Sequence, residues 1–433
     1  MDFLASDALR GRGSGTADEL LAATYIASEL KQYGVEPAGD AGSFIQRATV
    51  LHRPLTGSLR LTVKNSAGVV LHTWTHGKQF LALQLADGDV SGPLQKYSPS
   101  EPPTLKPGAF VFISRSGGQN IQQLAFQLIS QGAAAVIVPE STRLRARWDA
   151  LAAKLPTLPT QVEGNQQGDI SARATVLAVN YAAADQLAHA AEGTPLHLHA
   201  RPGKAHESYT WNVVGKISGT DPDQQHDDIL LTAHLDHLGV GVPVNGDDIY
   251  NGADDDASGT TAVLELARAL ASGPKPRRTV IFTLFGSEEK GALGSIYFRA
   301  HPPVPLQDIA AYLEFEMIGR PDPAVPRDTL WLTGWNRTNL GPELAKHGAH
   351  LVGDPHPAED FFQRSDNYVF AKQGVIAQTV SSYGLHPDYH QPSDDLAHID
   401  FQHMDEAIES LLAPVLWLAN SDFVPHWNEG GKP

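Results

Sequence analysis

Residues 229–259 read ILLTAHLDHLGVGVPVNGDDIYNGADDDASG. The stretch begins with a mostly apolar run, residues 229–233, which predicts a buried strand. A loop rich in Gly and Asp follows and ends at an AlaSerGly helix start. In an open α/β sheet, ligands bind at the carboxyl ends of the strands. The order of strand, loop and helix therefore predicts a metal site here, with His234 and Asp255 as ligands.

The composition is that of a globular protein. Of the 433 residues, 42% are hydrophobic and 19% are charged, and Gly and Pro interrupt the apolar runs throughout. This length fits about three domains, or one large α/β domain with an insertion. The formal net charge of -17, together with the lack of a long Lys/Arg run, argues against nucleic acid as a partner.

The chain contains no cysteine, which excludes disulfides and thiolate zinc sites. Any metal must therefore be held by nitrogen and oxygen atoms. No run of about 20 apolar residues is present, and Met1 is followed directly by AspPheLeuAlaSerAsp. We therefore expect neither a membrane span nor a signal peptide in this sequence.

Apolar periodicity predicts an α/β fold, with a mostly parallel mixed sheet covered by helices on both faces. A capping box at Thr16 and Glu19 opens an amphipathic helix that ends at Gly34. Further along the chain, predicted strands at 229–233, 279–285, 310–315, 329–333 and 375–380 alternate with helices near 259–271, 340–350 and 404–419.

Residues 87–203 differ from the rest in composition: Pro-rich connections surround a compact strand, helix and strand. We find no acid or histidine cluster there, so we expect an inserted domain that shapes access or binds partners. The main domain is then discontinuous, with residues 1–86 and 204–433. The insert's GlyAlaPheValPheIleSerArg, followed by a helix and GlnGlyAlaAlaAlaValIleVal, resembles the protease-associated domain found within several peptidases.

Acid or histidine residues follow four predicted strands. Alone, each has a simpler explanation: the three aspartates at 254–256 could cap the next helix, and the SerGluGluLysGly segment could be an exposed turn. Strand ends of one sheet converge in space, however, so the joint arrangement favours a site. The residues are His234 with Asp255, then Glu288 with Glu289, then Glu316, then His390.

Two histidines and three carboxylates form a mixed nitrogen and oxygen set that suits zinc, or cobalt and manganese, better than calcium. We expect two metal ions about 3.5–4 Å apart, bridged by one carboxylate. The charge of two divalent ions is balanced by three carboxylates and a bridging hydroxide. Glu288, beside a ligand, is the expected general base and acid, and Asp236 is expected to accept the second ring N–H of a ligand histidine.

Five segments then resemble the successive motifs of the co-catalytic di-zinc exopeptidase family. That family includes bacterial leucyl-type aminopeptidases, with glutamate carboxypeptidase and the transferrin receptor as relatives. The segments are AlaHisLeuAspHisLeuGly, GlyAlaAspAspAspAlaSerGly, GlySerGluGluLysGlyAlaLeuGlySer, PheGluMetIleGly and TyrHisGlnProSerAspAsp, within residues 211–419. The resemblance implies two zinc ions. It makes His234 and His390 terminal ligands, Asp255 the bridge, and Glu289 and Glu316 acid ligands. It makes Glu288 the base, and Asp236 the acceptor for the second ring N–H of a ligand histidine.

Some positions leave alternatives open. The family register selects Asp255, but sequence alone does not choose it over its neighbours Asp254 and Asp256. Position 316 is Glu where the best-known aminopeptidases carry Asp, and Glu314 is a second candidate on the same strand. The segment PhePheGlnArgSerAspAsn, residues 361–367, resembles the family's SerAspHis loop but has Asn for His, and Phe362 where some members place a tyrosine.

The sequence predicts a zinc-dependent aminopeptidase that removes N-terminal residues from peptides with a free amine, through a metal-bridging hydroxide and Glu288. The alternatives are a carboxypeptidase of glutamate-tailed peptides, a glutaminyl cyclase and a non-catalytic binding protein of the transferrin-receptor kind. A serine hydrolase is disfavoured because we find no GlyXaaSerXaaGly motif. Relatives with such an insertion imply a periplasmic or secreted location.

Overall fold

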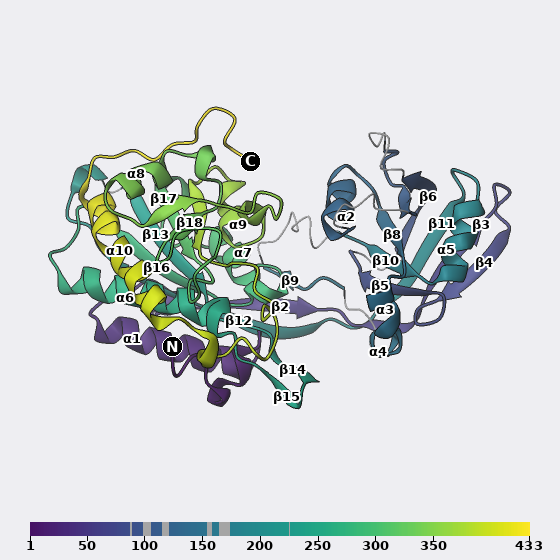
Figure 1. Ribbon diagram of the computed structural model, residues 1–433, viewed down its shortest axis with the longest axis horizontal. Helices are drawn as coiled ribbons and strands as arrows, with labels where there is room; N and C mark the ends of the chain where they lie inside the picture. The colour runs from purple at the N-terminus through teal and green to yellow at the C-terminus, as the bar shows by residue number, and fades with distance from the viewer. Residues whose placement is uncertain (87–88, 98–104, 115–120, 154–157, 164–173, 225) are drawn as a thin grey trace. The chain divides into compact units, whose positions relative to one another are not determined.

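A computed structural model describes residues 1–86, 89–97, 105–114, 121–153, 158–163, 174–224 and 226–433. The chain divides into two compact units (Figure 1). Unit 1 consists of residues 1–50 and 209–433 with a short piece at 162–165, and unit 2 consists of residues 51–161 and 166–208. All residues that the sequence analysis assigned to the metal site lie in unit 1.

Unit 1 is built on a ten-stranded sheet in the order β19-β18-β20-β17-β13-β16-β12-β2-β9, with β1 paired to β12. Its strands are β1 (Glu36–Pro37), β2 (Ile45–His52), β9 (Gln161–Val162), β12 (His206–Ile217), β13 (Asp228–His234), β16 (Val280–Phe285), β17 (Ile309–Phe315), β18 (Leu330–Leu332), β19 (Leu351–Gly353) and β20 (Ala377–Ser381). Strand β13 runs parallel to both neighbours, β16 and β17, and β20 continues the parallel part. Strands β12 and β18 run antiparallel to β16 and β20, so the sheet is mixed, as predicted.

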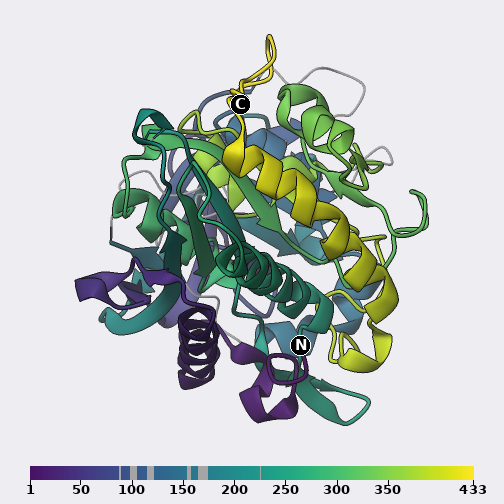
Figure 2. The same cartoon turned by 90° about the vertical axis from the view of Figure 1, so that its left-hand side faces the viewer.

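Helices cover both faces of this sheet. They are α1 (Ala17–Gln32), α6 (Gly259–Ser272), α7 (Leu293–Ala300), α8 (Leu340–Lys346), α9 (Asn367–Ala371) and α10 (Phe401–Asn420). Figure 2 shows α6 and α10 side by side over one face. Of the helices in the described residues, none has the length and apolar character of a membrane span.

The central strand β13 is mostly apolar because both of its faces are buried. All seven of its residues are buried. Leu231 and Ala233 pack in the core that contains α1, α6 and α10, whereas Leu230 packs in the core that contains α7 and α9. A strand with a core on each face has no polar side, which confirms the predicted α/β architecture.

Unit 2 has an eight-stranded sheet in the order β4-β3-β11-β6-β7-β8-β10-β5. Its strands are β3 (Leu55–Lys64), β4 (Val70–Thr75), β5 (Phe80–Gln84), β6 (Asp89–Tyr97), β7 (Phe110–Ile113), β8 (Ala135–Pro139), β10 (Val176–Val179) and β11 (Pro195–Pro202). Its helices are α2 (Ile121–Ser130), α3 (Thr142–Ala146), α4 (Trp148–Ala152) and α5 (Tyr181–His189). The protease-associated character of this unit stays a prediction.

The division differs from the predicted domain boundary. Residues 51–86, which the sequence analysis placed in the main domain, lie in unit 2. Strand β3 pairs with β11 and β5 pairs with β10, so strands from both sides of the predicted boundary share one sheet. The composition changes near residue 87, so the boundary was predicted there. The pairing of β3 and β5 with much later strands cannot be read from local composition.

Candidate metal centre

The carboxyl ends of three parallel strands of unit 1 carry the candidate ligands. His234 ends β13, Glu289 lies in the turn after β16, and Glu316 directly follows β17. Because these strands are parallel neighbours, their ends meet at one edge of the sheet. Asp255, just before α6, and His390, in the loop after β20, approach the same edge.

Asp255 lies at the centre of the cluster. Its Oδ1 is 3.0 Å from Nε2 of His234, and its Oδ2 is 3.2 Å from Nε2 of His390. The same nitrogen of His390 is 3.2 Å from Oε1 of Glu289. On the other side, one ligand atom each from His234, Asp255 and Glu316 lie within 4.8 Å of one another. Asp255 therefore contacts both halves of the cluster, as a bridging carboxylate would.

The two neighbouring aspartates have other partners. Oδ1 of Asp254 accepts the backbone N–H of Gly319 at 2.7 Å. Oδ1 of Asp256 accepts the backbone N–H of Met317 at 3.1 Å. Both therefore tie the segment after β17 to the start of α6, which leaves Asp255 to face the histidines.

A third histidine, His237, joins the cluster, and the sequence analysis did not select it. Its Nδ1 lies 2.8 Å from Oε1 of Glu289 and 3.9 Å from Oδ2 of Asp255. The side chain is completely buried. It packs against Gly252, where an added Cβ would come within 2.5 Å of the ring. The signal was present in AlaHisLeuAspHisLeuGly, where His237 stands three residues after His234.

Asp236 has a different contact from the one expected. Nδ1 of His234 lies 3.2 Å from the backbone oxygen of Asp236 but 3.8 Å from its carboxylate Oδ1. The carboxylate instead accepts the backbone N–H of Glu288 at 2.9 Å and the hydroxyl of Ser14 at 2.5 Å. The backbone carbonyl thus orients the histidine ring, and the carboxylate fixes the turn that carries Glu288 and Glu289.

Glu288 begins that turn (Glu288–Lys290) directly beside Glu289. Burial raises the pKa of Glu288 well above its usual value; the charge of His234 opposes the shift, and the carboxylates Asp366 and Glu289 add to it. A carboxyl group with a raised pKa beside a reactive centre can accept and return a proton near neutral pH.

Glu314, the second candidate on β17, has other partners. Its Oε2 accepts the backbone N–H of Asn367 at 2.8 Å and the hydroxyl of Thr379 at 3.0 Å. Asn367 is itself buried and donates its side-chain amide to the carbonyl oxygen of Phe362 at 3.1 Å. Glu314 and Asn367 therefore join β17 to the 361–367 segment, and Glu316 is the glutamate that lies near His234 and Asp255.

Electrostatics at the cluster indicate that it needs positive charge. Burial alone would lower the pKa of His234, but its contacts with Asp236 and Asp255 raise it well above the usual value. In the same way the pKa of His390 rises to about 10 through Asp255 and Glu289, against the effect of burial. Protons on the imidazoles would thus offset the buried carboxylates. A bound cation can replace those protons, because metal binding at such sites releases them.

The donor atoms also fit a metal. Among the described residues, several buried donor atoms make no hydrogen bond of good geometry, although some of them lie 2.8–3.2 Å from one another: Nε2 of His234, both ring nitrogens of His237, Oε1 of Glu289 and Nε2 of His390. Buried polar atoms are otherwise nearly always paired. Imidazole nitrogens and carboxylate oxygens are the ligands that zinc takes in the absence of cysteine. The cluster therefore satisfies the requirements of a zinc site.

A pocket with about 400 Å³ of empty space, including open solvent, lies beside Glu316. Half of the lining residues are aromatic or apolar and half are polar or charged, with one cationic side chain, Arg364. The lining residues are Glu316, Met317, Trp331, Thr333, Phe361, Arg364, Thr379, Ser381, Tyr383 and Tyr389. A ligand that fills the pocket would therefore lie next to the candidate metal ligands.

The sequence model of peptidase family M28 matches residues 212–415, the part of the chain that contains this cluster. Among curated proteins, leupeptin-inactivating enzyme 1 of Streptomyces exfoliatus is 33% identical over 115 residues, 26% of this chain and 24% of that protein. The probable lipoprotein aminopeptidase LpqL of Mycobacterium tuberculosis is 29% identical over 203 residues, 40% of this chain and 39% of that protein. The matches thus span less than half of the length of these relatives.

Among solved structures, an aminopeptidase from Aneurinibacillus sp. strain AM-1 superimposes with a TM-score of 0.57 at 20% identity, over 98% of this chain and 93% of that one. At this identity the likeness shows the fold alone. It covers almost the whole chain, including the residues of unit 2 that the family model does not match.

Proposed function

We propose that this chain, whose residues 212–415 match the model of peptidase family M28, is a zinc-dependent aminopeptidase that removes the N-terminal residue of peptides. The observation that carries the proposal is the position of Asp255, which contacts His234 through one carboxylate oxygen and His390 through the other. A single carboxylate shared by two sets of ligands is the arrangement that two-metal hydrolases use.

We assign one zinc ion to His234, Asp255 and Glu316, and a second to Asp255, Glu289 and His390, with His237 as a further donor on the second side. Each set has nitrogen and carboxylate donors within reach of one another. Zinc bound there would polarise the scissile carbonyl and lower the pKa of a water molecule toward about 7.

Glu288 is the proposed proton carrier. The Asp236 carboxylate accepts the backbone N–H of Glu288. This bond positions the turn beside the cluster and does not involve the Glu288 carboxylate. Glu288 would accept the proton of the attacking water and return it to the leaving amine, so one carboxyl group serves both steps.

Tyr389 is the proposed donor to the carbonyl oxygen. It lines the pocket together with Glu316, and its ring stacks on His390 at a centroid distance of 3.9 Å. Burial and then the charges of Asp255 and Glu289 raise its pKa well above the usual value, so the hydroxyl keeps its proton. The apolar and aromatic part of the pocket wall would take the side chain of the substrate's first residue.

A carboxypeptidase is the second candidate, and Arg364 is the observation that favours it. Its guanidinium lines the pocket, lies over the ring of Phe361 at 4.8 Å and is 3.4 Å from Glu359. An arginine in a substrate pocket suits a terminal carboxylate. A non-catalytic binding protein is disfavoured, because every expected ligand position and Glu288 are occupied by suitable residues.

Hydrolysis of three substrate sets tests the proposal: aminoacyl-p-nitroanilides, the same compounds blocked at the amine, and amine-blocked peptides with a free carboxyl terminus. An aminopeptidase cleaves only the first set, and activity disappears on chelation. Cleavage of the third set alone would support the carboxypeptidase instead. Cleavage of none by the zinc-loaded protein would overturn both. The E288Q variant serves as the background control.

We also propose a periplasmic or secreted location. The name of the Mycobacterium tuberculosis relative, a probable lipoprotein aminopeptidase, supports this location. Fractionation of the source organism, with activity measured on the substrate that the panel identifies, tests this directly.

A further inference from the structure

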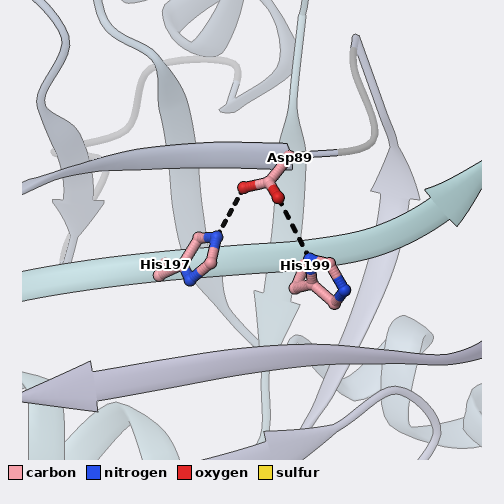
Figure 3. Close-up of side chains that lie close together, drawn as sticks. All are labelled: Asp89, His197 and His199. Atoms are coloured by element: carbon pink, nitrogen blue, oxygen red, sulfur yellow. Dashed lines mark hydrogen bonds and ion pairs between the residues drawn. The ribbon is translucent and has the colours of Figure 1, made fainter.

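A second group of metal-type ligands lies in unit 2, where the sequence analysis expected none. Asp89 opens β6, and His197 and His199 lie on β11, its antiparallel partner (Figure 3). Oδ1 of Asp89 is 2.5 Å from Nε2 of His197, and Oδ2 is 3.1 Å from Nδ1 of His199. The prediction was wrong because Asp89 is more than a hundred residues from the histidines, and only strand pairing brings the three together.

Strand geometry fixes the positions of all three side chains. His197 and His199 are two residues apart on β11, so both project from the same face of the sheet. Asp89 stands directly opposite His199 in the β6–β11 register. Two regular strands thus present three ligands on one face, before any ion is added.

The ligand atoms have the spacing that a small metal ion needs. One atom from each side chain lies within 4.8 Å of the others. Zinc holds imidazole and carboxylate ligands at about 2.0–2.2 Å, which places neighbouring ligands roughly 3.4 Å apart. Small rotations of the exposed side chains therefore suffice for all three to bind one ion.

The group differs from the ordinary histidine–aspartate pairs on this protein's surface. His189 with Asp185 and His398 with Asp395 are single pairs at 3.4 and 2.8 Å. In unit 2 two imidazoles converge on one carboxylate, with ring centroids 5.8 Å apart. The exposed fractions of the side chains are 58% for Asp89, 34% for His197 and 45% for His199, so an ion and its water ligands can enter.

One nearby cation limits the expected affinity. Arg60 on β3 stands opposite His199 on the other side of β11. Its Nε donates to the hydroxyl of Ser58 at 3.2 Å. Its positive charge disfavours a second cation close by, so this group should bind metal more weakly than the buried cluster of unit 1.

We propose that Asp89, His197 and His199 form a surface site for one divalent transition-metal ion such as zinc, separate from the peptidase cluster. Two imidazoles and one carboxylate select this class of ion over calcium or magnesium, which prefer oxygen alone. Three protein ligands leave coordination positions for water or an outside ligand. The bound ion would join β6 to β11, where the antiparallel and parallel parts of the sheet meet.

The test counts zinc ions on the full-length protein by equilibrium dialysis against zinc in about tenfold excess. The variants are H197Q, H199Q and D89N, and the matched control is H189Q, which removes an exposed histidine with a single acidic partner in the same unit. We expect each of the three variants to bind one ion fewer per chain than the wild type, and H189Q to bind the same number as the wild type.

Equal zinc counts in the wild type and all variants would overturn the proposal. A loss of one ion in H189Q as well would also overturn it, because zinc would then be bound by surface histidines in general. Peptidase activity in zinc-loaded H197Q and H199Q should equal that of the wild type. The outcome is thus independent of the proposed function, since the ion count requires no activity.

Discussion

Nδ1 of His237 lies 2.8 Å from Oε1 of Glu289, and both atoms are buried. A donor placed in this way acts on a bound metal either directly or by orienting Glu289. Substitution of residues around zinc ligands typically lowers metal affinity 10–100-fold. We therefore expect H237N to bind one of its zinc ions about 10–100-fold more weakly, as measured by competition with a chelator.

The matched control for H237N is H403N. His403 is also completely buried, and its Nε2 contacts the hydroxyl of Ser382 at 3.1 Å. Both variants lose a buried imidazole, so both should unfold at a lower temperature. Only H237N should lose zinc affinity. Equal affinities in the two variants would show that His237 is merely a packing residue.

Glu288 and Glu289 are adjacent in sequence, but we expect their substitutions to have different effects. E288Q should lower kcat by about 10²–10⁴-fold, because general acid–base catalysis supplies that range, while the zinc content stays unchanged. E289Q should lower the zinc content itself, since Oε1 of Glu289 contacts both His237 and His390. Metal analysis alongside kinetics on the same preparations separates the two roles. Loss of zinc in E288Q would contradict the assignment.

Removal of metal should abolish activity and lower thermal stability together. An ion that binds the folded chain adds stability by mass action, about 2.7 kcal/mol at a concentration 100 times its dissociation constant. Titration of the chelated protein with zinc should restore activity once two ions per chain occupy the cluster, with a parallel rise in the unfolding temperature. Full recovery with one ion would contradict the two-metal assignment.

Sequence patterns predicted the α/β fold of unit 1 because its strands are locally encoded. The buried strand β13 is an apolar run, and His234 marks its end. The choice among three aspartates was not local: it depends on Asp254 and Asp256 accepting backbone N–H groups from the segment after β17. Contacts of this kind leave no pattern in the neighbouring residues.

His237, the boundary of unit 2 and the Asp89 group were missed for the same reason. Each depends on strand register or loop packing that joins distant residues: His237 meets Glu289, β3 meets β11, and Asp89 meets His199. Nδ1 of His234 lies closer to the backbone oxygen of Asp236, at 3.2 Å, than to its carboxylate, at 3.8 Å, and residue identities alone do not specify which oxygen is nearer to the ring.

Tyr389 should contribute through its hydroxyl. Loss of one preorganised donor to a developing oxyanion costs about 10²–10³-fold in kcat in other hydrolases. We expect Y389F to lose about 100-fold in kcat with zinc content and KM nearly unchanged. Y383F is the control, because Tyr383 lines the same pocket and its ring packs against Phe361. A larger loss in Y383F would transfer the role to that residue.

Arg12 should stabilise the loops that carry the histidines. It is completely buried, and burial lowers its pKa despite the nearby charges of Asp236 and Asp256. Its guanidinium donates to four backbone carbonyl oxygens at 2.5–2.9 Å, those of Leu4, Leu235, Asn251 and Gly252. R12M would remove the Arg12 donor from the oxygens of Leu4, Leu235 and Asn251, at roughly 1–3 kcal/mol for each one that stays buried and unpaired, whereas the oxygen of Gly252 keeps the backbone N–H of Ala257 at 3.2 Å.

We therefore expect R12M to lower the unfolding temperature by roughly 6 °C or more, since about 1 kcal/mol corresponds to 2–4 °C in a domain of this size. Zinc affinity should fall as well, because Leu235 directly follows His234 and Gly252 packs against the ring of His237. R278M is the matched control. Arg278 is equally buried, but among the described residues its guanidinium donates a single hydrogen bond, from Nη2 to the backbone oxygen of Phe423 at 2.6 Å, and its backbone N–H donates to Ala419 at 3.0 Å. Because the backbone bond survives substitution, R278M forfeits a single side-chain bond. A larger temperature shift in R278M than in R12M would mean that burial of the guanidinium, rather than its bonds to the loops, determines the contribution of Arg12.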